Sequence, residues 1–179
     1  SYSRRERSEH RESVLYPPCI GVVVQGQKRA VIGLDENCYG RGEFLLCCVD
    51  MPSSFQITGT PEEPFLTVSL RLDPVLLSEI FSEMDAVQCE KSVGEYAADA
   101  EAVALPQTYH SGPERGLRVG SIKSDLLNAF QRLVSLADQP RKARFVAPLI
   151  VKEIHYYLAS GPDGRFLRSF FAPSSQSGQ

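Results

Sequence analysis

The sequence has no excess of basic residues, and this argues against direct binding to DNA. Its 179 residues include 19 lysines and arginines against 22 aspartates and glutamates, so the formal net charge is −3. Proteins that hold DNA through its phosphates usually show a basic face or a high pI. Arginines do gather near the start, but glutamates alternate with them. Residues 1–12 are therefore predicted to be a charged, flexible leader.

Long apolar runs are also missing. The apolar segments at residues 19–24 and 44–49 have the length of β-strands, whereas a membrane helix needs about 18 apolar residues. The start of the chain has none of the basic, apolar and small-residue regions of a signal peptide. We therefore predict a cytoplasmic protein, long enough to bury the core of one domain.

Histidine is scarce, and its positions do not indicate a metal site. His10, His110 and His155 lie in the charged leader, a predicted loop and the polar stripe of a predicted helix. None is paired at i+2 or i+4 with another, and a metal needs converging ligands. The sequence also has no glycine-rich phosphate loop and no motif that joins a nucleophile to a histidine base. We expect no metal, no cofactor and no catalytic residue, and predict that the chain is not an enzyme.

Short strands separated by turns fill residues 13–72. The clearest is at 65–72, where Leu66, Val68, Leu70 and Leu72 alternate with polar residues. The turns follow one another every 8 to 12 residues or closer, which is typical of sandwiches and barrels. The pattern predicts a small β-barrel over residues 13–72.

Five cysteines are present, none in a Cys-x-x-Cys pair, as is typical of reduced, mostly buried thiols. Cys47 and Cys48 are neighbours in a predicted strand, so they point to opposite faces. One of them should lie inside the barrel, where a thiol of lowered pKa could react with an aldehyde or an oxidant. The alternative is that both are small core residues.

Helices are predicted after the barrel. Asp73 and Pro74 are suited to begin a short helix over 73–85, residues 86–120 are predicted to be a loop or irregular insert, and residues 121–160 a pair of helices. The second of the pair is apolar almost all round, so it must be buried on more than one side. We expect a second copy of the chain to cover one side, giving a homodimer. The predicted dimer contacts are Leu126, Phe130, Leu133, Ile150, Ile154 and Tyr157.

Several segments resemble the amino-terminal domain of AraC-type transcription regulators. They are the Tyr-Pro-Pro-Cys-Ile-Gly-Val-Val-Val-Gln-Gly-Gln-Lys-Arg at 16–29, the Val-Asp-Met-Pro at 49–52, the Leu-Asp-Pro at 72–74, the Ala-Pro-Leu-Ile at 147–150 and the Gly-Pro at 161–162. The resemblance covers roughly residues 13 to 170.

The resemblance implies an α+β fold: a cupin-like, jelly-roll barrel (a double-stranded β-helix) that holds a small organic effector, followed by helices that dimerise. It implies a bacterial regulator whose operator DNA is read by two helix-turn-helix units outside this chain. Residues 161–179 would then be a turn and a linker to those units. Alternation alone assigns the barrel-facing ligand candidates: Val22, Val24, Leu46, Cys48, Phe55, Ile57, Val68 and Leu70.

Two other functions remain as alternatives. A cupin-type metalloenzyme, an isomerase or a dioxygenase, would need a bound metal. A purely structural dimerisation module would have its barrel filled by side chains. Binding of a small molecule without a metal distinguishes the effector domain from both, because a specific ligand stabilises the folded chain.

Overall fold

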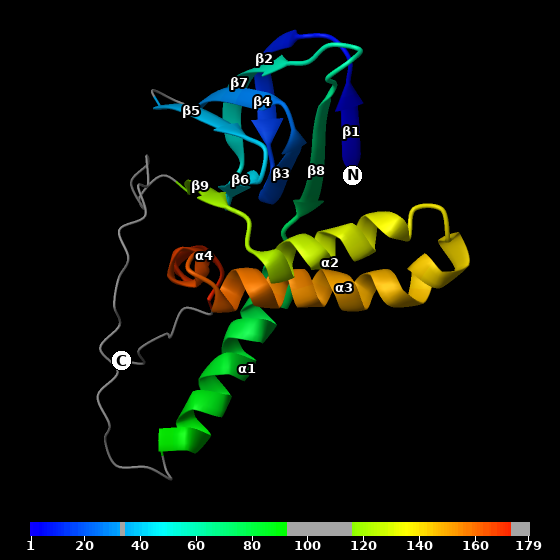
Figure 1. The fold of residues 1–179 in the computed structure, drawn as a ribbon. Coiled ribbons are helices and arrows are strands. Elements are labelled where there is room, and N and C mark those ends of the chain that lie inside the picture. Colours follow the sequence, from blue (N-terminus) through cyan, green and yellow to red (C-terminus); the bar gives the residue numbers. More distant parts are fainter. Residues whose placement is uncertain (33–34, 93–115, 173–179) are drawn as a thin grey trace.

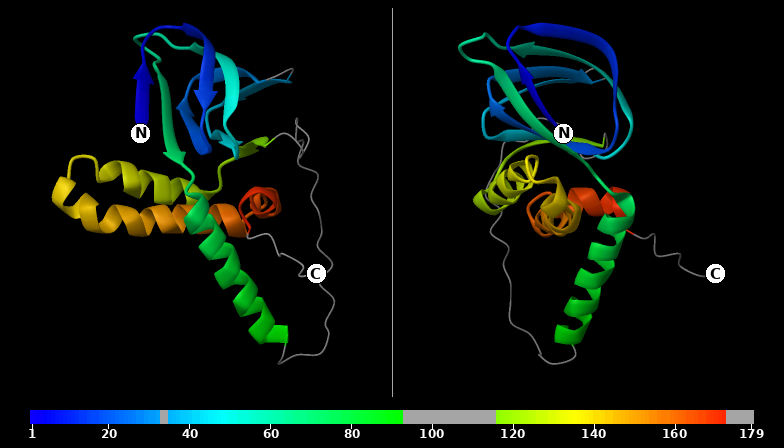
Figure 2. Two further views of the ribbon diagram at one scale, coloured as in Figure 1. Left: turned by 180° about the vertical axis from the view of Figure 1, so that it is seen from behind. Right: turned by 90° about the vertical axis from the view of Figure 1, so that its right-hand side faces the viewer.

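The computed structural model describes residues 1–32, 35–92 and 116–172, and its architecture is mixed α+β. Two antiparallel sheets lie at one end, and the helices lie on the outer side of one sheet (Figure 1). Figure 2 shows α2 and α3 side by side beneath the strands, with α1 pointing away from them. In the described residues, no helix is both long and apolar enough to cross a membrane.

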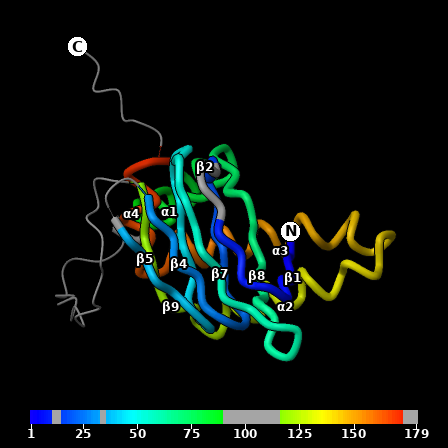
Figure 3. The backbone as a smooth tube through the Cα atoms, turned by 90° about the horizontal axis from the view of Figure 1, so that it is seen from above, coloured from blue at the N-terminus to red at the C-terminus, as the bar shows by residue number. Residues whose placement is uncertain are grey.

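The strands form two sheets whose partners are often far apart in the sequence. The first sheet has the order β1-β8-β3-β6-β9 and the second the order β2-β7-β4-β5. The first contains β1 (Tyr2–Arg5), β3 (Cys19–Gln25), β6 (Glu43–Cys47), β8 (Phe65–Arg71) and β9 (Leu117–Ser121); the second contains β2 (Glu9–Tyr16), β4 (Gln27–Ile32), β5 (Asp35–Gly40) and β7 (Met51–Thr58). Figure 3 looks down on these strands with the helices behind them.

The turn between β3 and β4 depends on a glycine. Gly26 has φ +82°, a conformation that side chains other than glycine's rarely adopt. A Cβ at this position would also lie 3.1 Å from the carbonyl oxygen of Thr58. This turn carries the chain from β3 in the first sheet to β4 in the second.

The predicted flexible leader is wrong for residues 2–5 and 9–12, which belong to strands. β1 pairs with β8 and places Tyr2 opposite Val68, while the Ser1 ammonium donates a 2.7 Å hydrogen bond to the carbonyl of Ser69. The reason is that β8 would otherwise leave an unpaired edge. Because Arg4 and Arg5 of β1 are exposed, their charges do not oppose this pairing.

The first helix is longer than the sequence pattern suggested, whereas the predicted pair at 121–160 contains two separate helices within its bounds. The helices are α1 (Pro74–Ser92), α2 (Ser124–Ser135), α3 (Pro140–Ser160) and α4 (Gly164–Phe171). The Asp73 carboxylate caps α1 by accepting the backbone N–H groups of Val75 and Leu76. The helix continues past residue 85 because no proline or glycine follows Pro74 until Gly94.

Part of the irregular insert expected over residues 86–120 has regular structure. The end of α1 and residues 117–120 of β9 fall within it, and residues 93–115 lie outside the described residues. Likewise, α4 lies where a turn and linker were expected, because Phe166 and Leu167 are buried against the helical core.

The first sheet is buried on both of its faces. One face meets the second sheet around Val23, Leu45, Cys47, Ile57 and Phe65. The other face meets the helices through a larger cluster that includes Ile20, Val22, Phe44, Leu46, Leu77, Phe81 and Ile154. The first sheet therefore separates two hydrophobic cores. One lies between the two sheets, and the other lies between the first sheet and the helices.

Candidate functional site

The space between the two sheets contains polar side chains as well as apolar ones. Strand alternation places Lys28 on the same face of β4 as Ala30 and Ile32, which are both buried there. In register, Lys28 lies opposite Tyr39 of β5 and Ile57 of β7, and both of these residues belong to the core between the sheets. A lysine therefore projects from the inner face of the second sheet.

The Lys28 ammonium lies against aromatic rings. Its Nζ is 4.2 Å from the ring centroid of Phe55 and 5.0 Å from that of Tyr16. Burial lowers the pKa of Lys28 to about 8, and the neighbouring Cys19 partly opposes this shift. Within the described residues, no carboxylate forms an ion pair with Lys28. The ring contacts stabilise the cation, and a bound anion would stabilise it further.

Two more hydrogen-bonding groups on this face have no partner among the residues that the structure describes. The Tyr16 hydroxyl and the Asn37 amide nitrogen are buried atoms without a hydrogen bond. Asn37 is 3% exposed and lies opposite Ala30, which lies opposite Phe55 on its other side. An unpaired buried polar group costs about 1–3 kcal/mol. A ligand with hydrogen-bond acceptors would remove this cost at both groups.

Sequence reasoning did not single out these polar groups as a site. The available signal was the alternation of Lys28 with Ala30 and Ile32, which predicts a cation on an apolar face. Tyr16 and Asn37 carry no such signal, because their neighbours come from strands that are distant in sequence.

The eight ligand candidates that strand alternation assigned do not all lie in the core between the sheets. Phe55 and Ile57 do lie in the core between the sheets. Val24 is 45% exposed. The other five face the helices and not the space between the sheets: Val22, Leu46, Cys48, Val68 and Leu70. Their placement inside the barrel was wrong because a sheet buried on both faces has apolar residues on both, so alternation cannot tell which face is inner.

The adjacent Cys47 and Cys48 also lie in different cores. Cys47 lies between the sheets and Cys48 lies among the helices. Burial raises the pKa of Cys47 to about 11, and burial also raises that of Cys48 well above its ordinary range. The lowered pKa that the sensor hypothesis required is therefore absent at both thiols.

The predicted dimer residues also lie mainly inside one chain. Leu126, Phe130, Ile150 and Ile154 are buried in the core between helices and sheet, and Leu133 and Tyr157 pack against it. The large exposed apolar side chains of α3 are instead Phe145, Leu149 and Tyr156. The prediction chose the inner face because both faces of this helix are apolar.

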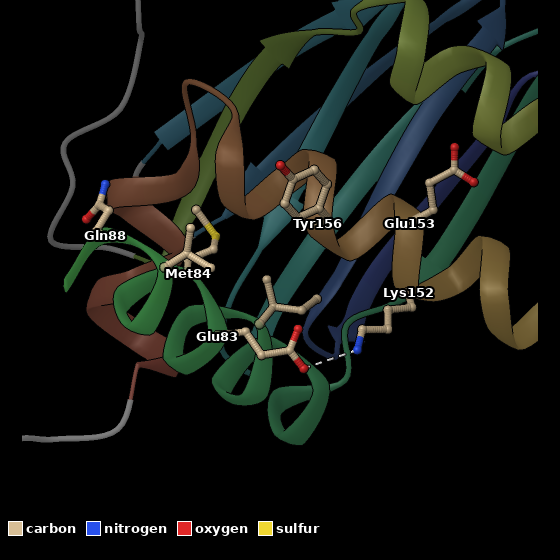
Figure 4. A pocket seen from close by; sticks show the side chains of 8 residues that line it. Glu83, Met84, Gln88, Lys152, Glu153 and Tyr156 are labelled. Atoms are coloured by element: carbon tan, nitrogen blue, oxygen red, sulfur yellow. Dashed lines mark hydrogen bonds and ion pairs between the residues drawn. The ribbon is translucent and has the colours of Figure 1, made fainter. Parts of the chain in front are cut away.

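A groove lies between α1 and α3 in the described part of the chain. Its volume is about 450 Å³, and it is lined by Ile80, Glu83, Met84, Val87, Gln88, Lys152, Glu153 and Tyr156. Figure 4 shows that the charged head of Lys152 faces Glu83, with 3.3 Å between Nζ and Oε1. Its cation is thus already paired, unlike that of Lys28. Across residues 1–32, 35–92 and 116–172, no three His, Cys, Asp or Glu side chains gather as they would around a metal.

Comparison with known proteins identifies the family and the fold. The family described as AraC-type transcriptional regulator N-terminus matches residues 1–166. No curated protein matches the sequence significantly. Among solved structures, the apo form of a ToxT variant from Vibrio cholerae has a TM-score of 0.59 at 11% identity and covers 97% of this chain and 58% of that one.

Two ligand-bound ToxT structures from Vibrio cholerae are similar to this chain. One is described as bound to an unsaturated fatty acid, with a TM-score of 0.56 and 9% identity over 96% of this chain and 56% of that one. The other is described as bound to (E)-4-(8-methylnaphthalen-1-yl)but-3-enoic acid, with a TM-score of 0.54 and 8% identity over 96% and 57%. At these identities the likeness shows the fold alone, and the chain spans less than two thirds of each neighbour.

Proposed function

The chain belongs to the AraC-type transcriptional regulator N-terminus family, and we propose that it senses a small organic effector on behalf of a bacterial transcription regulator. The two facing sheets would close into a cupin-like, jelly-roll barrel around that effector. Support comes from the core between the sheets, which contains hydrogen-bonding groups without partners. A pocket of mainly apolar lining with a few convergent polar groups is the usual form of a small-molecule site.

Lys28 is the observation on which this proposal depends. Its ammonium lies on the inner face without a carboxylate partner among the described residues, and the Tyr16 hydroxyl is buried without a hydrogen bond. These groups suit a ligand with one anionic end, while Phe55 and Ile57 suit an apolar body. We therefore propose a carboxylate with an apolar chain or ring system. The carboxylic acids bound by the two ToxT structures belong to this class.

The proposed regulator acts as a dimer and reads DNA with another part of the protein. Because this chain spans less than two thirds of ToxT, we place operator recognition in two helix-turn-helix units that follow it. A second copy of the chain would cover the exposed stripe of α3. The work of such a regulator places it in the cytoplasm, where bacterial DNA lies.

Replacing Lys28 tests the effector site. We expect oleate, kept below its micelle-forming concentration, and a soluble aromatic butenoic acid to raise the melting temperature of the wild-type chain. The change Lys28→Met should weaken binding by about 1.5–3 kcal/mol, or roughly 10- to 100-fold, because the ligand loses a charge-assisted hydrogen bond. Isothermal titration calorimetry measures the two dissociation constants.

Arg29→Gln is the matched control for this experiment. Arg29 is the next residue of β4, but it is exposed and pairs with Glu36 on the outer face. The control should bind both acids as the wild type does. Equal affinity of the Lys28→Met and wild-type chains would contradict the proposed site, and so would a wild-type chain that binds neither acid.

A further inference from the structure

Two cysteines from different strands lie directly opposite each other in the first sheet. Cys19 of β3 is in register with Cys47 of the antiparallel strand β6. Residues directly opposite in such a pair have Cα atoms roughly 4.5 or 5.5 Å apart. Disulfides span Cα separations of roughly 4.4–6.8 Å. The backbone therefore already has a spacing that a disulfide can bridge.

Both side chains point into the same space. Cys47 is completely buried in the core between the sheets, and Cys19 packs against that core while remaining half-buried. Cys48, the next residue along, faces the helices instead. Only one cysteine of the adjacent pair can thus meet Cys19, and the other is a natural control.

The surroundings make the two thiols unequal. Burial raises the pKa of Cys19, but the positive charges of Lys28 and Arg71 act in the opposite direction. Among the described residues, no cation opposes the raised pKa of Cys47 in this way, and its thiol donates a 3.1 Å hydrogen bond to the carbonyl of Val49. Cys19 is also the more accessible of the two. It is therefore the thiol that an oxidant reaches first, with Cys47 as its resolving partner.

We propose that Cys19 and Cys47 are a redox site that closes into a reversible disulfide under hydroperoxides. The Cys19 thiolate attacks one oxygen of the peroxide, the O–O bond breaks, and hydroxide or alkoxide leaves, so Cys19 becomes a sulfenic acid. The Cys47 sulfur then attacks the Cys19 sulfur, its proton goes to the departing hydroxyl, and water is released. The two thiols together give two electrons to one peroxide, and a dithiol reductant reverses the bond by exchange. This inference does not depend on the proposed effector, because the reaction needs only the peroxide.

The test is oxidation of the reduced chain followed by peptide mapping. Cys38 and Cys89 are exposed, so both are first changed to serine to prevent links between molecules. Hydrogen peroxide should then remove the mass of two hydrogen atoms from most of the protein, and dithiothreitol should restore it. Trypsin should yield peptide 12–28 linked to peptide 42–71. The linked pair should disappear in Cys19→Ser and in Cys47→Ala.

Cys48→Ala is the decisive control, because Cys47 and Cys48 share one tryptic peptide. The linked pair should form as readily in this variant as in the parent. Three results would overturn the proposal: no linked peptide at any peroxide concentration, a link that needs Cys48, or a Cys19 that proceeds to sulfinic acid without linking. Circular dichroism of each variant shows that the chain compared is folded.

Discussion

At the scale of single residues, His155 shows how a buried polar group can be fully satisfied. Its Nδ1 lies 2.7 Å from the carbonyl oxygen of Val151, and its Nε2 accepts a 3.0 Å hydrogen bond from the backbone N–H of Asp73. A carbonyl can only accept and an amide N–H can only donate, so the ring is neutral with its proton on Nδ1. The sequence pattern had placed this residue on the polar stripe of a predicted helix. The structure places it at the joint between α3 and the start of α1.

This arrangement predicts a dependence of stability on pH. Burial lowers the pKa of His155 below its ordinary 6.5, so the unfolded chain takes up the proton at a higher pH than the folded chain does. The neutral His155 therefore contributes its full share to the free energy of unfolding above about pH 6.5. This contribution is lost as the pH drops from there through the lowered pKa of the folded chain. The change His155→Gln should remove this loss. It should also cost about 1–3 kcal/mol at neutral pH, because the N–H of Asp73 loses its acceptor.

Urea unfolding at about pH 7 and pH 5 measures both effects. His10→Gln is the control, because His10 is exposed on β2, and it should keep the pH dependence of the wild type. Parallel losses of stability in the wild type and the His155→Gln chain would show that another group is responsible.

At the scale of elements, an ion pair joins β9 to the start of α4. The Arg118 Nε lies 3.0 Å from Asp163 Oδ1, and the Asp163 side chain is only 7% exposed. Burial raises the pKa of Asp163, and the positive charges of Arg118 and Lys123 oppose that shift. The Arg118 guanidinium also stands over the ring of Phe166 in α4. The pair thus connects the edge of the first sheet to the last helix.

Breaking this pair should destabilise the chain markedly. We expect Arg118→Met to cost about 3 kcal/mol, the low end for a buried pair, because 21% of the arginine side chain reaches solvent. The double change Arg118→Met with Asp163→Asn should cost less than the sum of the two single changes, because no buried charge is left unpaired. Urea unfolding of the four chains gives this double-mutant cycle.

Arg168→Met is the control at the same helix. Arg168 of α4 pairs with Asp85 of α1, but both side chains are substantially exposed, so its loss should matter much less. If the Arg118→Met chain is as stable as the Arg168→Met chain, the buried ion pair does not contribute the stability that we expect.

At the scale of the whole molecule, α3 is the element with apolar residues on two sides. Its inner side buries Ile150 and Ile154 in the helical core. On the opposite side, Phe145 is 75% exposed, Leu149 69% and Tyr156 49%. These three are spaced i, i+4 and i+11, so they form one stripe along the helix. Phe145 and Leu149 are neighbours one turn apart, and the paired Lys152 lies between Leu149 and Tyr156. Neighbouring exposed apolar side chains of this kind are typical of an interaction site.

The stripe predicts which changes abolish the proposed dimer. The wild-type chain should be a dimer at micromolar concentration, and the double change Phe145→Glu with Leu149→Glu should make it a monomer without unfolding it, because both side chains are exposed within one chain. Light scattering measures the mass. Val75→Glu is the control, since Val75 is 67% exposed at the start of α1, and it should leave the dimer intact. A monomeric wild type, or a double variant that remains a dimer, would contradict the proposal.

Local pattern predicted much of the fold and some of the site. Alternation and turn residues located β3, β4, β6, β7 and β8, and the cap at Asp73 located the start of α1. The quoted motifs identified the family. The sequence pattern predicts that Lys28 is a cation on an apolar face. It does not predict the contacts of Lys28 with Tyr16 and Phe55, because these residues come from other strands.

The sequence by itself therefore determined the strands from β3 to β8, the start of α1 and the family to which the chain belongs, because these depend on residues close together in the chain. Only the tertiary structure decided which face of each strand lies between the sheets. It also decided that β1 and β9 complete the first sheet, and that Cys19 opposes Cys47. The physical reason is that β3 and β6 are buried on both sides. Their two faces are equally apolar, and only the pairing of distant segments distinguishes the inner face from the outer one.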